Sequence, residues 1–356
     1  MLGDRIKQAR IAAGLSLRQL SEKMNRYVSA QVIHKYELGK AKPGSDVLIH
    51  LSKALGVKVE YFFRPEPVRV TLSKPAYRKR YAVSAKQIQS IQAQVMGWVE
   101  RYLEVESLFP ENRFASIKLP DKKQRLIKSM NDVETLALSL RKLWELGIDP
   151  IENLTEVLED RGVKVVMLEG EDDFDGLSSW ANEKIPVILI KRGLSGDRQR
   201  SSQAHELGHL IMNVSPNIDG EKAAFRFSGA FLVPEEVVYR ELGKQRHALD
   251  LGELNMLKKK YGMSMQQWIY RAKDLSIISE SRASELFRLF RRKGWNRREP
   301  GFTIPSEEPQ RFKRLILQGV TERLISPARA AEILGEPFNH FRKSLQVELA
   351  EEEHRP

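Results

Sequence analysis

The most constraining feature of the sequence is the segment 204–210, AHELGHL, in which two histidines stand four residues apart. Four residues make about one helical turn, so a helix here would place the imidazoles of His205 and His209 on one face. Two imidazoles on a rigid helix supply half of the tetrahedral shell that zinc prefers. Glu206 lies about 100° round the helix, beside a metal rather than on it. Since its carboxylate could take a proton from a metal-bound water, the segment predicts a metal site suited to hydrolysis.

The neighbouring segments favour this interpretation over the alternative, a surface helix with two solvated histidines. An apolar run at 186–190 predicts a buried strand before the helix. A polar loop at 213–220 follows it, and a second helix is expected to begin at Glu221. Three residues, Ala204, Leu207 and Ile211, fall opposite the histidines on a helical wheel and are expected to be buried. Glu221 is therefore the candidate third ligand.

The AHELGHL segment and the helix that begins at Glu221 resemble the ImmA/IrrE-type metallopeptidases. These are gluzincin-like proteins with AHELGH on one helix and a glutamate ligand on the next. The second helix matches the family pattern at Glu221, Ala224, Phe227, Leu232 and Pro234. It departs from the pattern at Phe225, where asparagine is usual, and at Ser228, where alanine is usual.

The resemblance implies a metal-dependent endopeptidase. Its metal, zinc or alternatively manganese, would be bound by His205, His209 and Glu221. Glu206 would be the catalytic general base. An oxyanion-stabilising residue is not identified by the motif, and Tyr239 and His247 are candidates only because they follow the two helices.

The positive charge of the chain is concentrated near its N-terminus. The 356 residues carry a net charge of +12, while residues 1–65 alone contribute +7 and residues 66–82 contribute +4. This distribution indicates a polyanionic partner for the N-terminal region. The absence of cysteine excludes disulfides, thiolate metal sites and a cysteine nucleophile. No signal peptide or membrane span is expected, so the predicted location is the cytoplasm.

Four short helices are predicted at residues 4–13, 17–24, 30–37 and 45–55. Glycines at 14, 39 and 56 end three of them, and serines at 16 and 29 cap two. A short helix, a tight connection and a second short basic helix form the helix-turn-helix pattern.

This pattern resembles the Xre/Cro-type helix-turn-helix domain over the whole of residues 1–65. The residues that carry the resemblance are Arg5-Ile6, Ala9-Arg10, Gly14-Leu15-Ser16, Gln19-Leu20, Tyr36-Glu37, Gly39, Pro43, Leu51 and Leu55-Gly56-Val57. The resemblance implies a homodimer on a palindromic operator in double-stranded DNA, with the helix 30–37 in the major groove. The alternative is a four-helix domain that binds only protein.

Six side chains are the candidate DNA contacts under this resemblance. Gln31 and Lys35 would read base edges, and Val32 would contact a thymine methyl group. Arg18, Gln19 and Lys40 would lie at phosphates.

Between the two motifs, residues 64–82 form a basic connector punctuated by prolines. Apolar residues at threes and fours predict a helix of about twenty-four residues from Ser84, which is expected to pack on the peptidase or, as the alternative, to bind a partner. The lysine-rich stretch up to Asp132 is interpreted as a linker. A helix is expected at 134–146, and the next is expected to be capped at 149–152. Strands at 162–168, 176–181 and 186–192 would form a small sheet.

The predicted fold class is multidomain and mainly α, with an α+β peptidase. The predicted division is a helix-turn-helix domain at 1–65, a basic linker and long helix at 66–129, a metallopeptidase domain at 130–300 and a C-terminal helical segment at 301–356.

Two functions remain open at this level. One is a DNA-binding transcriptional regulator with a zinc-dependent endopeptidase domain that cleaves a repressor-type protein, derepressing stress or mobile-element genes. The other is an Xre-family regulator or antitoxin whose peptidase-like domain senses a metal or ligand without hydrolysis.

Overall fold

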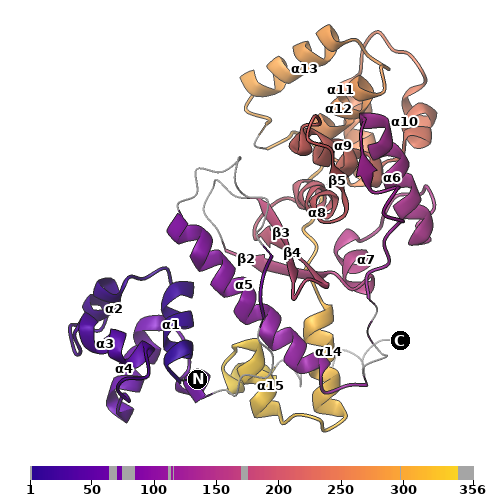
Figure 1. Ribbon diagram of the computed structural model, residues 1–356. Coiled ribbons are helices and arrows are strands. Elements are labelled where there is room, and N and C mark those ends of the chain that lie inside the picture. Colours follow the sequence, from indigo (N-terminus) through magenta and orange to yellow (C-terminus); the bar gives the residue numbers. More distant parts are fainter. Residues whose placement is uncertain are drawn as a thin grey trace. The chain divides into compact units, whose positions relative to one another are not determined.

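The computed structural model describes residues 2–63, 70–73, 85–110, 114, 116–169, 175–296 and 298–343 (Figure 1). Contacts divide the chain into two compact units. The first comprises residues 1–72, 82–111 and 312–356, and the second comprises 73–81 and 112–311. Most of the predicted basic connector lies outside the described residues. In the described part of the chain, no helix is both long and apolar enough to cross a membrane.

The first unit begins with five short elements: α1 (Leu2–Ala12), α2 (Leu17–Lys23), α3 (Ala30–Glu37), α4 (Ser45–Leu55) and the 3-10 helix η1 (Val59–Phe63). Serine caps explain where α2 and α3 begin, because the side chain of Ser16 accepts from Gln19 N and that of Ser29 accepts from Val32 N. Between them Asn25 and Arg26 adopt left-handed backbone conformations, with φ of 52° and 57°. The predicted bounds of α3 and α4 agree with the structure.

The long helix α5 (Ala85–Glu106) packs inside this first unit, on α1 and on the C-terminal helices α14 (Arg311–Thr321) and α15 (Pro327–Leu334). Tyr102 is buried and stacks on Phe312 with ring centroids 5.0 Å apart. Arg5 of α1 donates to Glu100 of α5 at 2.7 Å, and both side chains are largely buried. The sequence predicted the helix correctly but favoured the peptidase as its packing partner. Helical periodicity shows an apolar stripe without showing what covers it.

The second unit contains a three-stranded sheet with the order β2-β4-β3. Strand β2 (Lys164–Leu168) pairs in parallel with β4 (Ile185–Lys191), which pairs antiparallel with β3 (Gly176–Ala181). Strand β3 is therefore the edge on the side away from β2. A second pair, β1 (Leu126–Ile127) with β5 (Asn213–Val214), is parallel. The prediction that the stretch before Asp132 is only a linker is thus wrong, since Ile127 is a buried strand residue.

Eight helices of the described residues complete this unit: α6 (Met130–Leu143), α7 (Leu154–Asp160), α8 (Gly196–Ile211), α9 (Gly220–Leu232), α10 (Glu235–Leu242), α11 (Leu251–Tyr261), α12 (Met265–Asp274) and α13 (Glu280–Arg292). Helix α8 packs against both β3 and α9 (Figure 1). Helix α7 begins later than predicted, because Asn153 rather than the 149–152 segment caps it by accepting from Glu156 N.

Glu307 joins α7 to α8 from a segment that has no regular secondary structure. Its carboxylate accepts from Arg200 Nε at 2.5 Å and from Thr155 N and Oγ1 at 2.8 and 2.9 Å. The side chains of Arg200 and Glu307 are 10% and 8% exposed. Removing one member of such a buried pair leaves the other charge uncompensated. Glu307 therefore holds the N-terminal half of the histidine-bearing helix in place.

We expect Glu307→Gln to lower the free energy of unfolding of the second unit by about 3 kcal/mol, because Arg200 would lose its buried counter-charge. Glu308→Gln is the matched control, since Glu308 pairs with Arg192 at an exposed site where a pair contributes about 0–1 kcal/mol. Urea denaturation of the full chain measures both. Equal midpoints for the two variants would contradict the role assigned to Glu307.

Candidate functional site

Three side chains from α8 and α9 converge on one point. His205 and His209 lie one turn apart on α8, and their Nε2 atoms are 3.0 Å apart. Glu221 lies in the first turn of α9, where Asp219 caps the helix by accepting from Glu221 N and Lys222 N. Its carboxylate oxygens are 3.5 Å from His205 Nε2 and 3.3 Å from His209 Nε2. The structure thus brings together the three predicted ligands.

The spacing of these donor atoms fits a tetrahedral metal ion. Zinc bonds of about 2.1 Å at tetrahedral angles place two ligand atoms roughly 3.4 Å apart. The observed separations between the ligand atoms, 3.0–3.5 Å, are close to this distance. Among the described residues, the triad is the group of His, Asp and Glu side chains whose donor atoms lie close enough to bind a metal. Two imidazoles and a carboxylate also match the donor types of catalytic zinc sites.

The two histidines also act on the charge of the third ligand. Hydrogen bonds from His205 and then His209 hold the pKa of Glu221 well below its usual range, against the opposing effect of burial. Glu221 is therefore ionised at neutral pH, which is the form that binds a cation.

The third ligand can reach the histidines because α8 and α9 approach closely. A Cβ atom on Gly208 would lie only 3.0 Å from Cδ1 of Phe227, so a larger residue there would require the ring to shift by a few tenths of an ångström. Ser228 on α9 also donates to the carbonyl of Ser201 on α8 at 2.8 Å. Ser228, which departs from the family pattern, thus forms a direct bond between the two helices.

Glu206 lies on α8 between the two histidines in sequence and is 8% exposed. Its Oε2 accepts from the Ser178 hydroxyl of β3 at 2.8 Å. Gly176 on the same strand permits this approach, because a Cβ there would meet Glu206 Cγ at 3.2 Å and Ile190 Cδ1 at 3.1 Å. The sequence analysis missed Ser178. The period-two alternation of the predicted strand offered a signal, since it places residues 176 and 178 on one face.

Phe225 lies next to the triad, and its ring centroid is 4.5 Å from that of His205. The side chain is 48% exposed. A phenyl ring cannot hydrogen-bond to the Glu221 carboxylate as an amide would. The departure from the family pattern therefore replaces a polar neighbour of the ligands with an apolar one.

The two candidate oxyanion residues have other contacts. The hydroxyl of Tyr239 donates to the carbonyl of Leu275 at 3.4 Å, and His247 is exposed, with its carbonyl accepting from Arg282 Nε. Burial raises the pKa of Tyr239, so its phenol is neutral at pH 7. Neither observation supports an oxyanion role, which stays a hypothesis.

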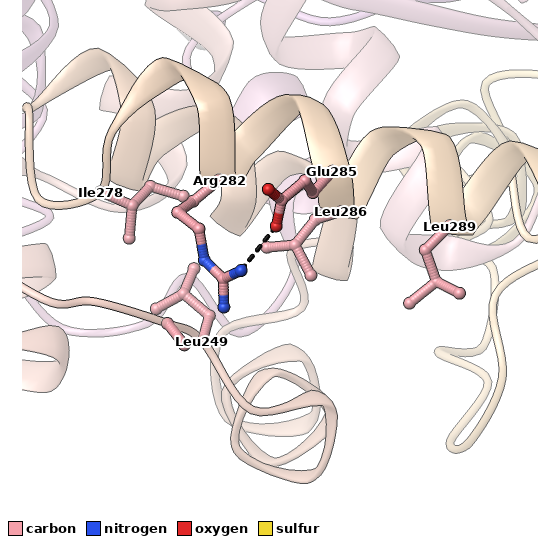
Figure 2. Close-up of a pocket in the computed structure, with 7 residues that line it drawn as sticks. Leu249, Ile278, Arg282, Glu285, Leu286 and Leu289 are labelled. Carbon is pink, nitrogen blue, oxygen red and sulfur yellow. Dashed lines mark hydrogen bonds and ion pairs between the residues drawn. The ribbon is translucent and has the colours of Figure 1, made fainter.

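A hollow in the second unit involves none of the predicted site residues (Figure 2). It lies along α13 and is lined by Ala248, Leu249, Ile278, Arg282, Glu285, Leu286 and Leu289. Arg282 and Glu285 pair with each other at 2.5 Å (Figure 2). The hollow is mainly apolar and offers a single carboxylate, so it is not a second metal site.

The candidate DNA contacts lie on α2, α3 and the turn after α3. Gln31 and Lys35 are exposed on α3, and Val32 is partly buried. Arg18 and Lys40 are also exposed. His34, which the sequence analysis did not select, is exposed on α3 as well. The surface of α3 thus offers polar groups that could enter a groove.

Gln19 differs from the other candidate contacts because its Oε1 already accepts from Ser16 N and from Lys86 Nζ, both at 2.9 Å. The first bond belongs to the cap of α2. These bonds fix the orientation of the side-chain amide, whose nitrogen is the group that could donate to a phosphate.

The fold and the two sites define a protein with a helix-turn-helix domain and a metallopeptidase-like domain. Comparison with known families agrees: a helix-turn-helix family matches residues 6–62, and the IrrE N-terminal-like domain of the peptidase M78 family matches residues 158–273. The chain therefore carries an Xre-type helix-turn-helix domain and an IrrE-like domain.

One curated relative is the SPbeta prophage-derived uncharacterized HTH-type transcriptional regulator YonR of Bacillus subtilis (strain 168). It is 33% identical over 64 residues, which are 18% of this chain and 57% of the relative. The likeness thus covers a small part of this chain and little more than half of the relative.

We expect the wild-type chain to bind about one zinc ion and His205→Ala to bind none, because two remaining ligands cannot complete the shell. Zinc at a hundredfold excess over its Kd should also stabilise the wild type by about 2.7 kcal/mol and leave His205→Ala unchanged. Elemental analysis and thermal unfolding measure these effects. His247→Ala is the matched control, and a His205→Ala protein that keeps its zinc would contradict the assignment.

Proposed function

We propose that this protein is a DNA-bound transcriptional regulator whose zinc-dependent endopeptidase domain cleaves a repressor-type protein, releasing stress or mobile-element genes. The observation that carries the proposal is the buried Glu206, which follows the candidate ligand His205 on α8 and accepts a hydrogen bond from Ser178. A site that only sensed a metal would need the three ligands but no additional carboxylate at this position. Both proposed partners, operator DNA and a repressor, are consistent with a cytoplasmic protein.

The triad and Glu206 would divide the work of peptide hydrolysis. The three ligands would hold zinc, which when bound supplies a Lewis acid that activates water and polarises the scissile carbonyl. Glu206 would accept a proton as the water oxygen bonds to the carbonyl carbon. It would then return that proton to the leaving nitrogen as the C–N bond breaks. General acid–base transfer of this kind typically contributes 10²–10⁴-fold to a rate.

A second candidate function is a regulator or antitoxin whose peptidase-like domain senses a metal or ligand without hydrolysis. Phe225 favours it, because its exposed ring contacts the ligand His205 at the position where the related metallopeptidases usually carry asparagine. The two functions differ in their need for Glu206, which only hydrolysis requires.

We expect Glu206→Gln to abolish repressor cleavage while zinc content, fold and DNA binding stay unchanged, because the amide cannot accept the proton. Each variant is co-expressed with an Xre-type repressor encoded beside its gene. The length of that repressor under inducing conditions is then measured.

The control is His209→Ala, which removes a proposed ligand and should abolish function under either hypothesis. Regulation that survives Glu206→Gln but not His209→Ala would support the sensor. Cleavage that continues with Glu206→Gln would remove the proposed general base.

For DNA binding we propose a homodimer on a palindromic operator, because one helix-turn-helix reads only a half-site. Gln31→Ala should weaken operator binding by about 1–3 kcal/mol and leave random DNA nearly unaffected, since Gln31 is proposed to contact a base. Arg18→Ala should weaken both alike, because phosphate contacts carry no sequence information. Fluorescence anisotropy at fixed salt measures both. Parallel losses on both DNAs for Gln31→Ala would argue against base reading.

A further inference from the structure

The proposed general base Glu206 on α8 has a hydrogen-bond partner on a strand of the sheet. Ser178 lies on the edge strand β3, and its hydroxyl donates to Glu206 Oε2 at 2.8 Å. Ser178 and Glu206 are 7% and 8% exposed. Few water molecules can therefore compete for this hydrogen bond, and a bond to an ionised carboxylate is stronger than one between neutral groups.

A glutamate needs such a partner to act as a base with defined geometry. Its side chain has three rotatable bonds, and proton transfer requires the accepting oxygen to lie within about 3 Å of the donor. The bond from Ser178 fixes one carboxylate oxygen and so limits rotation of the whole group. With Oε2 held by Ser178, Oε1 also takes a defined position, from which it can accept the proton.

We propose that Ser178 is a positioning residue for Glu206, which it orients for proton transfer without touching the substrate. This inference rests on the proposed peptidase function. The inference adds a residue of the sheet to the site formed by the motif on α8. The Ser178 hydroxyl reaches the Glu206 carboxylate because β3 approaches α8 closely at Gly176.

Strand β3 does not depend on the Ser178 hydroxyl for its own position. Its backbone pairs with β4 from Gly176 to Ala181. On the next two residues, Ser179 Oγ donates to the carbonyl of Ser73 at 2.9 Å, and Ser73 N donates to the carbonyl of Trp180 at 2.9 Å. Loss of the Ser178 hydroxyl should therefore leave the strand in place and release only the carboxylate.

Ser179 provides a matched control because it is a buried serine on the same strand, 5% exposed, whose side chain alternates to the opposite face. Both Ser178→Ala and Ser179→Ala remove one buried hydroxyl: that of Ser178 donates to Glu206, whereas that of Ser179 contacts the carbonyl and the hydroxyl of Ser73. Only the first of these bonds ends on Glu206.

The experiment compares the zinc-loaded full chain with its Ser178→Ala and Ser179→Ala variants on a fluorogenic peptide that spans the bond cut in the repressor. We expect Ser178→Ala to lower kcat about tenfold with KM and zinc content unchanged, and Ser179→Ala to leave kcat within twofold of the wild type. Equal kcat values for all three proteins, or equal losses in both variants, would overturn the proposal.

Crystal structures of the zinc-loaded wild type and Ser178→Ala provide a readout that needs no cleavage. One Glu206 conformer in the wild type and several in the variant would support positioning, whereas the same single conformer in both would overturn it. If the wild type cleaves no repressor, the proposed function fails, and these structures still decide whether Ser178 orients Glu206.

Discussion

The candidate metal site depends on the close packing of α8 against α9. His205 and His209 are neighbours on one helix, but Glu221 can join them only if the second helix lies near enough. Gly208 favours this approach, because a Cβ there would lie only 3.0 Å from the Phe227 ring, which would have to shift by a few tenths of an ångström. The apolar contact between the helices thus sets the donor separations of 3.0–3.5 Å, which are those of a tetrahedral ion.

Buried charges of the second unit are paired in a way that ties distant segments to α8. Arg200 on α8 binds Glu307, and Asp197 near its start binds Lys258 of α11 at 3.0 Å. Lys258 also binds Glu299 at 2.9 Å. Burying such ions is costly unless each is compensated, so the pairs penalise any arrangement that separates them. We infer that they specify the position of α8, while apolar burial supplies most of the stability.

The sequence predicted those features that depend on residues a few positions apart. The bounds of α3 and α4, the serine caps of α2 and α3, and the strand at 176–181 all follow from local rules and agree with the structure. Apart from the start of α7, which Asn153 caps, the errors concern contacts between distant segments. Periodicity could not show that α5 packs on Phe312, nor that Ile127 of the supposed linker pairs with Val214.

The same distinction applies to the site. The sequence alone determined that His205 and His209 share a face, because a helix places residues four apart together whatever surrounds it. It also indicated Glu221 through the pattern of the second helix. Only the tertiary structure decided that Ser178 binds Glu206, 28 residues away, and that Glu307 binds Arg200, 107 residues away. These partners meet because the sheet and the helices pack together, and no local spacing encodes that packing.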